Sequence, residues 1–170
     1  MTTPNENFQT WESVSERMPE LLATLKSCEL LHRDRRGQLP QVPERGIYVF
    51  YHGDRPFYVG RTDRMRQRLQ EHGRPSSGHN SATLAFAMAF RIAKSQGMDS
   101  IDASSRGALQ DDPEFEKWFD TTKEIVSKMG IRVVEVTDPI EQAVFEVYAA
   151  LELGTIRGRG QVGFNDFENH

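Results

Sequence analysis

The chain has 170 residues and a mass of 19.4 kDa, which suits one compact domain. It is 37% hydrophobic and 27% charged with a single cysteine, a composition that excludes wholesale disorder, collagen-like repeats and a disulfide-stabilised miniprotein. The formal net charge of −4 excludes a global basic field, so any phosphate-binding surface must be local. No apolar run approaches the ~20 residues that cross a bilayer, and the first ten residues lack a basic segment followed by an apolar one. We therefore expect no membrane anchor, no signal peptide and a cytoplasmic location.

The hydrophobic pattern predicts a mixed α/β order. Apolar residues at helical spacing predict a helix from about Trp11 to Leu31, which a Pro- and Gly-containing linker follows. Gly46–Tyr51 and Phe57–Val59 flank a turn-forming segment, His52–Pro56, and together predict a β-hairpin. The remaining elements are expected in this order: a helix that Thr62 or Asp63 caps and that runs to about His72, a buried helix over Ala82–Ser95, an irregular stretch over Gly97–Asp112, a helix over Pro113–Met129, a strand over Ile131–Thr137, and a helix over Pro139–Leu153 that Asp138 caps.

Charge is distributed unevenly along the chain. Between Arg55 and Arg74 there are six arginines and two acidic residues, whereas positions 99–124 hold eight acidic and three basic residues. The sequence therefore predicts a basic pole beside the hairpin and an acidic lobe elsewhere.

Alternation along the predicted hairpin gathers aromatic side chains on one face. If the strands pair symmetrically about the turn, Phe50 faces Tyr58 and Tyr48 faces Gly60. Gly60 would leave room there for a ligand or for backbone to approach. Two phenols on one face are also typical of an aromatic pair that packs a core.

The helix after the hairpin adds cations. Arg64, Arg68 and His72 fall at i, i+4 and i+8, which is one helical stripe. Such a stripe is often a solvated surface, but this one directly follows the strand that carries Tyr58 and Gly60. Arginine offers a planar fork suited to phosphate oxygens, and histidine moves protons near neutral pH.

These residues together resemble a known family. Gly46-Ile47-Tyr48, then Tyr58-Val59-Gly60, then Arg68 and His72, are similar to the signature of the GIY-YIG nuclease superfamily. The resemblance implies an α/β (α+β) fold with a small three-stranded antiparallel sheet flanked by helices. It divides the chain into an N-terminal helical extension and linker (1–44) and a nuclease-like domain (45–170) with a helical insertion at about 73–130.

The resemblance also implies site roles. Tyr48 would act as general base for the attacking water or would position that water, and Tyr58 would hydrogen-bond at the scissile phosphate. Arg68 would stabilise the charge that develops there, and His72 would assist proton transfer or orient Tyr48. An isolated phenol has a pKa of ~10, so acting as a base requires help from a neighbouring cation or metal ion.

Members of the family hold one divalent metal ion, Mg²⁺ or Mn²⁺, through a glutamate on a later helix. Glu146 lies inside an apolar run of the last predicted helix, where a carboxylate is costly to bury without a cation, so it is the expected ligand. Glu141 is the reserve candidate. Alternatively Gln142, Glu146 and Ala150 form a stripe that faces solvent.

Further DNA contacts are expected outside this centre. Arg61, Arg64, Arg66 and Arg74 would contact phosphates and position the duplex rather than read its sequence. The family's asparagine after the last helix corresponds to Asn165, with Asp166, Glu168, Asn169 and His170 as alternatives in the same tail.

The sequence therefore predicts a metal-dependent DNA endonuclease that hydrolyses phosphodiester bonds. The alternatives are a non-catalytic nucleic-acid or protein binding module on the same fold, with the acidic lobe serving a partner, and a nuclease that acts on RNA or on branched DNA.

Overall fold

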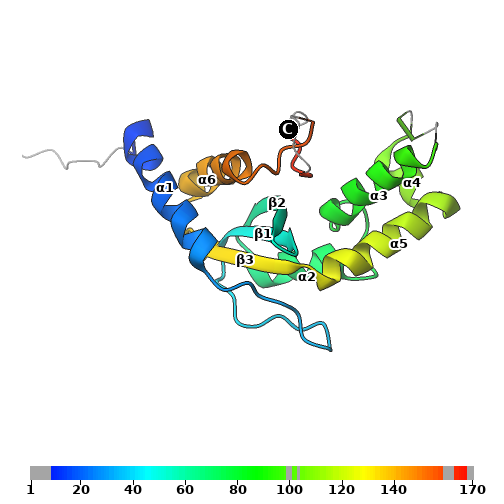
Figure 1. Cartoon of the computed structure of the whole chain (residues 1–170), viewed down its shortest axis with the longest axis horizontal. Coiled ribbons are helices and arrows are strands. Elements are labelled where there is room, and N and C mark those ends of the chain that lie inside the picture. The colour runs from blue at the N-terminus through cyan, green and yellow to red at the C-terminus, as the bar shows by residue number, and fades with distance from the viewer. Residues whose placement is uncertain (1–8, 99–100, 103, 159–162, 168–170) are drawn as a thin grey trace, which may run out of the picture.

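The computed structural model of the chain describes residues 9–98, 101–102, 104–158 and 163–167. These residues form a three-stranded antiparallel sheet, in the order β2-β1-β3, with helices around it (Figure 1), which confirms the expected α+β class. In chain order the elements are α1 (Trp11–Ser27), β1 (Gly46–His52), β2 (Arg55–Thr62), α2 (Met65–Gly73), α3 (Thr83–Ser95), α4 (Arg106–Gln110), α5 (Pro113–Lys128), β3 (Gly130–Glu135) and α6 (Pro139–Glu152).

The β1–β2 hairpin has the register that the sequence predicts. Tyr48 pairs with Gly60, and Phe50 pairs with Tyr58. The three aromatic rings lie on one face, where the Tyr48 ring centroid is 5.8 Å from that of Phe50 and 6.3 Å from that of Tyr58.

The hairpin turn is tighter than expected. His52 already pairs with Arg55, so Gly53 and Asp54 alone form the turn, and a register shift after Phe50 absorbs the extra residue. Gly53 has a φ of +60°, which a glycine adopts without strain and which suits the first central position of a type II′ turn.

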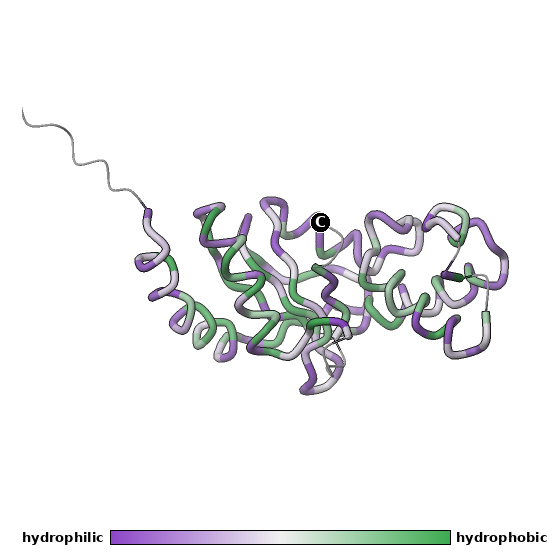
Figure 2. Tube along the Cα trace, turned by 90° about the horizontal axis from the view of Figure 1, so that it is seen from above, coloured by the Kyte–Doolittle hydropathy of each residue, from purple (hydrophilic) through white to green (hydrophobic). Residues whose placement is uncertain are grey.

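Each face of the sheet carries its own hydrophobic core. Tyr48 and Phe50 pack with α2, α3 and α5, whereas Ile47 and Val49 point to the opposite face and pack with α1 and α6. Figure 1 shows the α3–α5 helices together at one end of the molecule and α1 beside α6 at the other. In Figure 2 the hydrophobic residues gather where the sheet meets these helices.

The N-terminal segment is part of the second core. Leu25 of α1 is fully buried, and α1 packs against α6 and β3. The α1 helix continues through Pro19 without a break and ends at Ser27, about one turn earlier than expected. The predicted extension 1–44 thus contributes a helix to the same packed unit as the sheet.

Two predicted helix starts have opposite outcomes. The Asp138 carboxylate accepts the backbone N–H groups of Ile140 and Glu141 at 2.9 and 2.8 Å, so the predicted cap of α6 is confirmed. The predicted cap of α2 is wrong, because that helix begins at Met65. The Thr62 hydroxyl instead accepts the backbone N–H of Arg64, and Asp63 accepts the side-chain amide of Gln142.

The insertion between β2 and β3 contains more helix than predicted. The stretch expected to be irregular includes α4, a five-residue helix whose N-cap is Ser105. One turn of helix is too short to show a hydrophobic period, which is why the sequence pattern missed it. The insertion packs on itself through a buried hydrogen bond, 2.7 Å long, from the Thr122 hydroxyl on α5 to the Ala85 carbonyl on α3. Among the helices of the described ranges, none combines the length and the apolarity that spanning a bilayer requires.

Candidate active site

The centre of the candidate site is a buried pair formed by Tyr48 on β1 and His72 on α2. The Tyr48 hydroxyl lies 2.8 Å from Nε2 of His72, and neither side chain is more than 1% exposed. Gly60, opposite on β2, makes this placement possible, because a Cβ at that position would overlap the Tyr48 phenol. The space beside Gly60, which was expected to admit a ligand or backbone, is therefore filled by the side chain of Tyr48.

Burial sets the protonation of this pair. Burial raises the pKa of Tyr48 above its ordinary value, and the nearby Arg68 guanidinium offsets only part of that increase. Burial, and then the positive charges of Arg68 and Arg33, lowers the pKa of His72 well below its ordinary value. At neutral pH the phenol is protonated and the imidazole is neutral, so Nε2 of His72 is able to accept a hydrogen bond from the Tyr48 hydroxyl.

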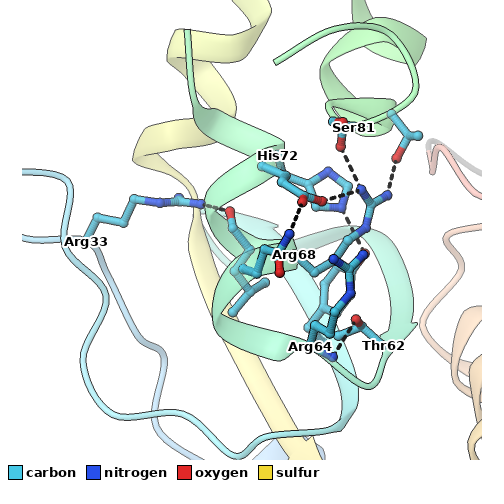
Figure 3. A network of polar contacts seen from close by, with 11 residues as sticks. Arg33, Thr62, Arg64, Arg68, His72 and Ser81 are labelled. Atoms are coloured by element: carbon cyan, nitrogen blue, oxygen red, sulfur yellow. Dashed lines mark hydrogen bonds and ion pairs between the residues drawn. The ribbon is translucent and has the colours of Figure 1, made fainter. Parts of the chain in front are cut away.

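Arg68 on α2 lies beside both phenols. Its Nη1 donates to the Ser81 carbonyl at 2.8 Å (Figure 3), and its Nη2 donates to the Thr83 hydroxyl at 3.1 Å. Nη1 also lies 3.4 Å from a carboxylate oxygen of Glu71, one helical turn away. The guanidinium is thus fixed between α2 and the start of α3, and its side chain remains 18% exposed.

A cleft of about 360 Å³ opens beside Tyr58. Its walls come from β2, from α3, from α6 and from the C-terminal segment 163–167, and they include Tyr58, Thr83 and Glu146. The Tyr58 ring centroid is 5.7 Å from that of His72, so Tyr58 links the buried pair to the cleft. Burial raises the pKa of Tyr58, and a hydrogen bond with Thr83 and the charge of Arg68 oppose that increase.

Glu146 on α6 brings a carboxylate to this cleft. Its side chain is 21% exposed, and its Oε2 accepts a hydrogen bond from Nε of Arg61 on β2 at 2.9 Å. The Thr83 hydroxyl and the Asp166 carboxylate line the same cleft, and hard oxygen donors of this kind fit Mg²⁺ or Mn²⁺. Within the described ranges, no three His, Cys, Asp or Glu side chains gather as a metal site, so water and substrate oxygens would complete the coordination of an ion held by Glu146.

The other glutamate candidate lies elsewhere. Glu141 is 7% exposed, and its carboxylate pairs with Arg17 of α1 at 2.6 Å, where it joins α1 to α6. The stripe expected to face solvent as an alternative is not solvated, because Gln142 and Ala150 are both buried.

The four arginines expected to contact phosphates differ in their surroundings. Arg66 donates to the carbonyls of Leu39 and Pro40 at 3.2 and 2.9 Å and so holds the linker against α2. Arg61 pairs with Glu146 as described above. The exposed residues Arg64 and Arg74 lie at the two ends of α2.

Asn165, expected to contact DNA, has a positioning role. Its side-chain oxygen accepts the Val59 backbone N–H at 2.8 Å, and its side-chain nitrogen donates to the Val59 carbonyl at 2.7 Å. Only 4% of the residue is exposed, so both ends of its amide are used on the free edge of β2. Of the alternatives in this tail, Asp166 lines the cleft, and Glu168, Asn169 and His170 lie outside the described residues.

Several residues that support the site were not predicted. Glu71 could have been found, because its i, i+3 spacing from Arg68 is that of a helical ion pair. Ser81 and Thr83 reach Arg68 across a loop, and Arg33 donates to the Leu69 carbonyl of α2 from the linker. No local pattern indicates contacts of this kind.

Comparisons of the chain with protein-family models, with curated proteins and with solved structures found no match.

Proposed function

We propose that this protein is a metal-dependent endonuclease that hydrolyses phosphodiester bonds in DNA. The observation that carries the proposal is the arrangement of four groups, two of which line one cleft. Tyr58 and Glu146 line the cleft, Arg68 lies beside Tyr58, and the Tyr48–His72 pair lies behind them. This arrangement combines a fixed cation for a phosphate, a carboxylate for a metal ion and a hydrogen-bonded proton acceptor, which are the components that phosphodiester hydrolysis requires.

In the proposed reaction Arg68 binds a non-bridging oxygen of the scissile phosphate and stabilises the negative charge that develops there. The Tyr58 hydroxyl donates a hydrogen bond to the same phosphate. Tyr48 takes a proton from the attacking water as it passes its own proton to Nε2 of His72. The bound phosphate would favour this transfer, because its negative charge offsets the charge of Arg68, which lowers the pKa of His72 in the free protein. A bound Mg²⁺ or Mn²⁺, held by Glu146, would supply Lewis-acid stabilisation of the phosphate and of the leaving oxygen.

The direct test is cleavage of supercoiled plasmid by the full chain with Mg²⁺ or Mn²⁺, and with EDTA. We expect nicked or linear products that require the metal ion. Glu146→Gln should abolish cleavage, and Arg68→Ala should slow it by about 10²–10³-fold, the usual cost of removing one charge-stabilising donor.

Matched variants make this test specific. Glu152→Gln changes an exposed carboxylate on the same helix, and Arg35→Gln changes an exposed arginine of the linker, so both should cut at the wild-type rate. Glu141→Gln should lower stability through its lost contact with Arg17 and should still cut. Folded wild-type protein that binds DNA and cuts none with either metal ion would instead support the non-catalytic binding module.

We propose a cytoplasmic location as well. Cys28 is a free thiol in the structure, which suits a reducing compartment that holds DNA.

A further inference from the structure

The cleft that Glu146 lines also has an aromatic wall. Phe86, Phe90 and Phe164 line it, and a second hollow of about 270 Å³ continues past Phe90 and Phe164 along α3. Phe90 is half-buried, so part of its ring faces the cleft. These rings extend the candidate active site well beyond the four groups that the proposed hydrolysis uses.

Each of these rings has a guanidinium near its face. Arg91 lies 3.9 Å from the centroid of Phe164, and Arg106 lies 4.6 Å from that of Phe86. Arg157 lies 5.7 Å from the ring centroid of Phe90. Aromatic faces interleaved with cations are the combination with which proteins bind unpaired nucleotides, because bases stack on the rings and phosphates pair with the arginines.

The position of this wall relative to Arg68 sets what it would contact. Thr83 lines the cleft and also accepts a hydrogen bond from Arg68. A phosphodiester that reaches Arg68 therefore brings its adjacent nucleotide against Phe90, because Phe86 is 5% exposed and packs in the core against Phe115 and Phe119. A base that is paired and stacked in a duplex cannot enter such a cleft, because its partner strand would enter with it, whereas an unpaired base enters without the cost of unstacking.

We infer that the cleft receives an unpaired nucleotide, so that the substrate is DNA with an unpaired base next to the scissile phosphate. This inference rests on the proposed nuclease function and specifies its substrate class. The volume of about 360 Å³ falls within the ~300–1,000 Å³ of sites that take small molecules the size of a nucleotide.

Binding tests the inference without cleavage. The protein is the full chain with Glu146→Gln, and the probes are two DNAs of the same sequence. One is a continuous duplex, and the other has a single-stranded flap with 2-aminopurine as its first unpaired base. We expect the flap DNA to bind about tenfold more tightly, as measured by anisotropy, and its 2-aminopurine fluorescence to be quenched by stacking.

Variants locate the stacking site. Phe90→Leu should remove the quenching and most of the preference for the flap. Ala87→Met should have the same effect, because a larger side chain at this position narrows the cleft and leaves every ring of the wall in place. The test therefore does not depend on whether the Phe90→Leu protein folds. Trp11→Leu is the matched control, because Trp11 is an aromatic residue 73% exposed on α1.

The outcomes separate the two proposals. Equal affinity for the two DNAs, or a preference that Phe90→Leu and Ala87→Met leave unchanged, would overturn the unpaired-base site. Equal cutting of flap and duplex DNA by wild-type protein with Mg²⁺ would also overturn it and leave the nuclease proposal intact. Quenching that depends on Phe90, in a protein that cuts no DNA, would support the site and contradict the nuclease.

Discussion

At the scale of single residues, the proposed role of the Tyr48–His72 pair comes with a cost in stability. Nδ1 of His72 is buried and, among the described residues, has no hydrogen-bond partner. A protonated imidazole would therefore bring an unpaired positive charge into a core beside Arg68. In the resting protein His72 is held in its neutral form, in which Nε2 accepts the hydrogen bond of the Tyr48 hydroxyl.

This neutral histidine predicts a pH-dependent stability. The pKa of His72 is lowered well below its ordinary value in the folded chain, whereas the unfolded chain binds a proton near pH ~6.5. Below that pH the unfolded state binds more protons than the native state, so the contribution of His72 is fully present above it and is lost as the pH falls. Between pH 7 and pH 5 we expect the free energy of unfolding to drop by about 2 kcal/mol more in wild type than in His72→Gln.

Urea unfolding of both proteins at the two pH values measures this difference. The absolute stability of the variant does not enter, because only the change with pH is compared. Parallel pH dependences of the two proteins would show that His72 is protonated in the folded chain.

Gly60 is a second residue with a specific role, because its backbone lies in close contact with the Tyr48 ring. Because a Cβ there would overlap the Tyr48 ring, Gly60→Ala should displace the phenol from His72 and destabilise the fold by about 1–3 kcal/mol, the usual cost of overpacking. Cleavage should fall with it. Gly107→Ala is the control, since the nearest atom to a Cβ at that helical position is 4.0 Å away, and it should be neutral or slightly stabilising. A stable, fully active Gly60→Ala protein would contradict the expected overlap between a Cβ at position 60 and the Tyr48 ring.

At the scale of elements, the free edge of β2 is covered by the C-terminal segment. Asn165 bonds both backbone groups of Val59 and also accepts the Thr155 hydroxyl at 2.8 Å, while the Phe164 N–H donates to the Phe57 carbonyl at 2.9 Å. This segment protects an exposed strand edge and forms one wall of the cleft. One asparagine therefore couples the order of β2 to the shape of the site.

Removing that amide should destabilise the edge. Asn165→Ala leaves the buried N–H and C=O of Val59 without partners, which costs about 1–3 kcal/mol for each unsatisfied group. We expect faster hydrogen exchange at the Val59 amide and a lower melting temperature. Asn80→Ala, at an exposed loop position, should change neither. Unchanged exchange at Val59 would contradict the assigned role.

The same elements show what sequence alone can and cannot predict. The alternation of side chains on the two sides of the hairpin turn was enough to predict that Tyr48 pairs with Gly60, because hairpin register is a local property. The start of α2 was predicted too early, since the Thr62 hydroxyl serves a turn instead of a helix end. The contact of Asn165 with Val59 joins residues 106 positions apart, and no periodicity encodes a contact of that range.

At the scale of the whole molecule, charge separates along the long axis. The exposed arginines Arg55, Arg64 and Arg74 belong to the hairpin and to α2, near the sheet. Acidic residues of the insertion, including Asp111, Glu116 and Asp120, lie on the α4–α5 side, although positions 99, 100 and 103 of this segment are outside the described residues. A net charge of −4 therefore conceals a basic region on the hairpin and α2.

This separation predicts that the salt dependence of DNA binding is modest and that only a few arginines cause it. Each phosphate contact contributes about −0.9 to the slope of log K against log salt concentration for duplex DNA. Arg64→Gln and Arg74→Gln should each make the slope shallower by about 0.9, because both side chains are exposed at the ends of α2, the helix that carries Arg68. Lys117→Gln removes an equal charge from exposed α5 in the acidic lobe and should leave the slope unchanged. Titrations of the Glu146→Gln protein, which we expect to bind DNA without cutting it, measure these slopes at several salt concentrations. Equal losses from all three substitutions would mean that the overall charge of the chain, and not the basic region, governs DNA binding.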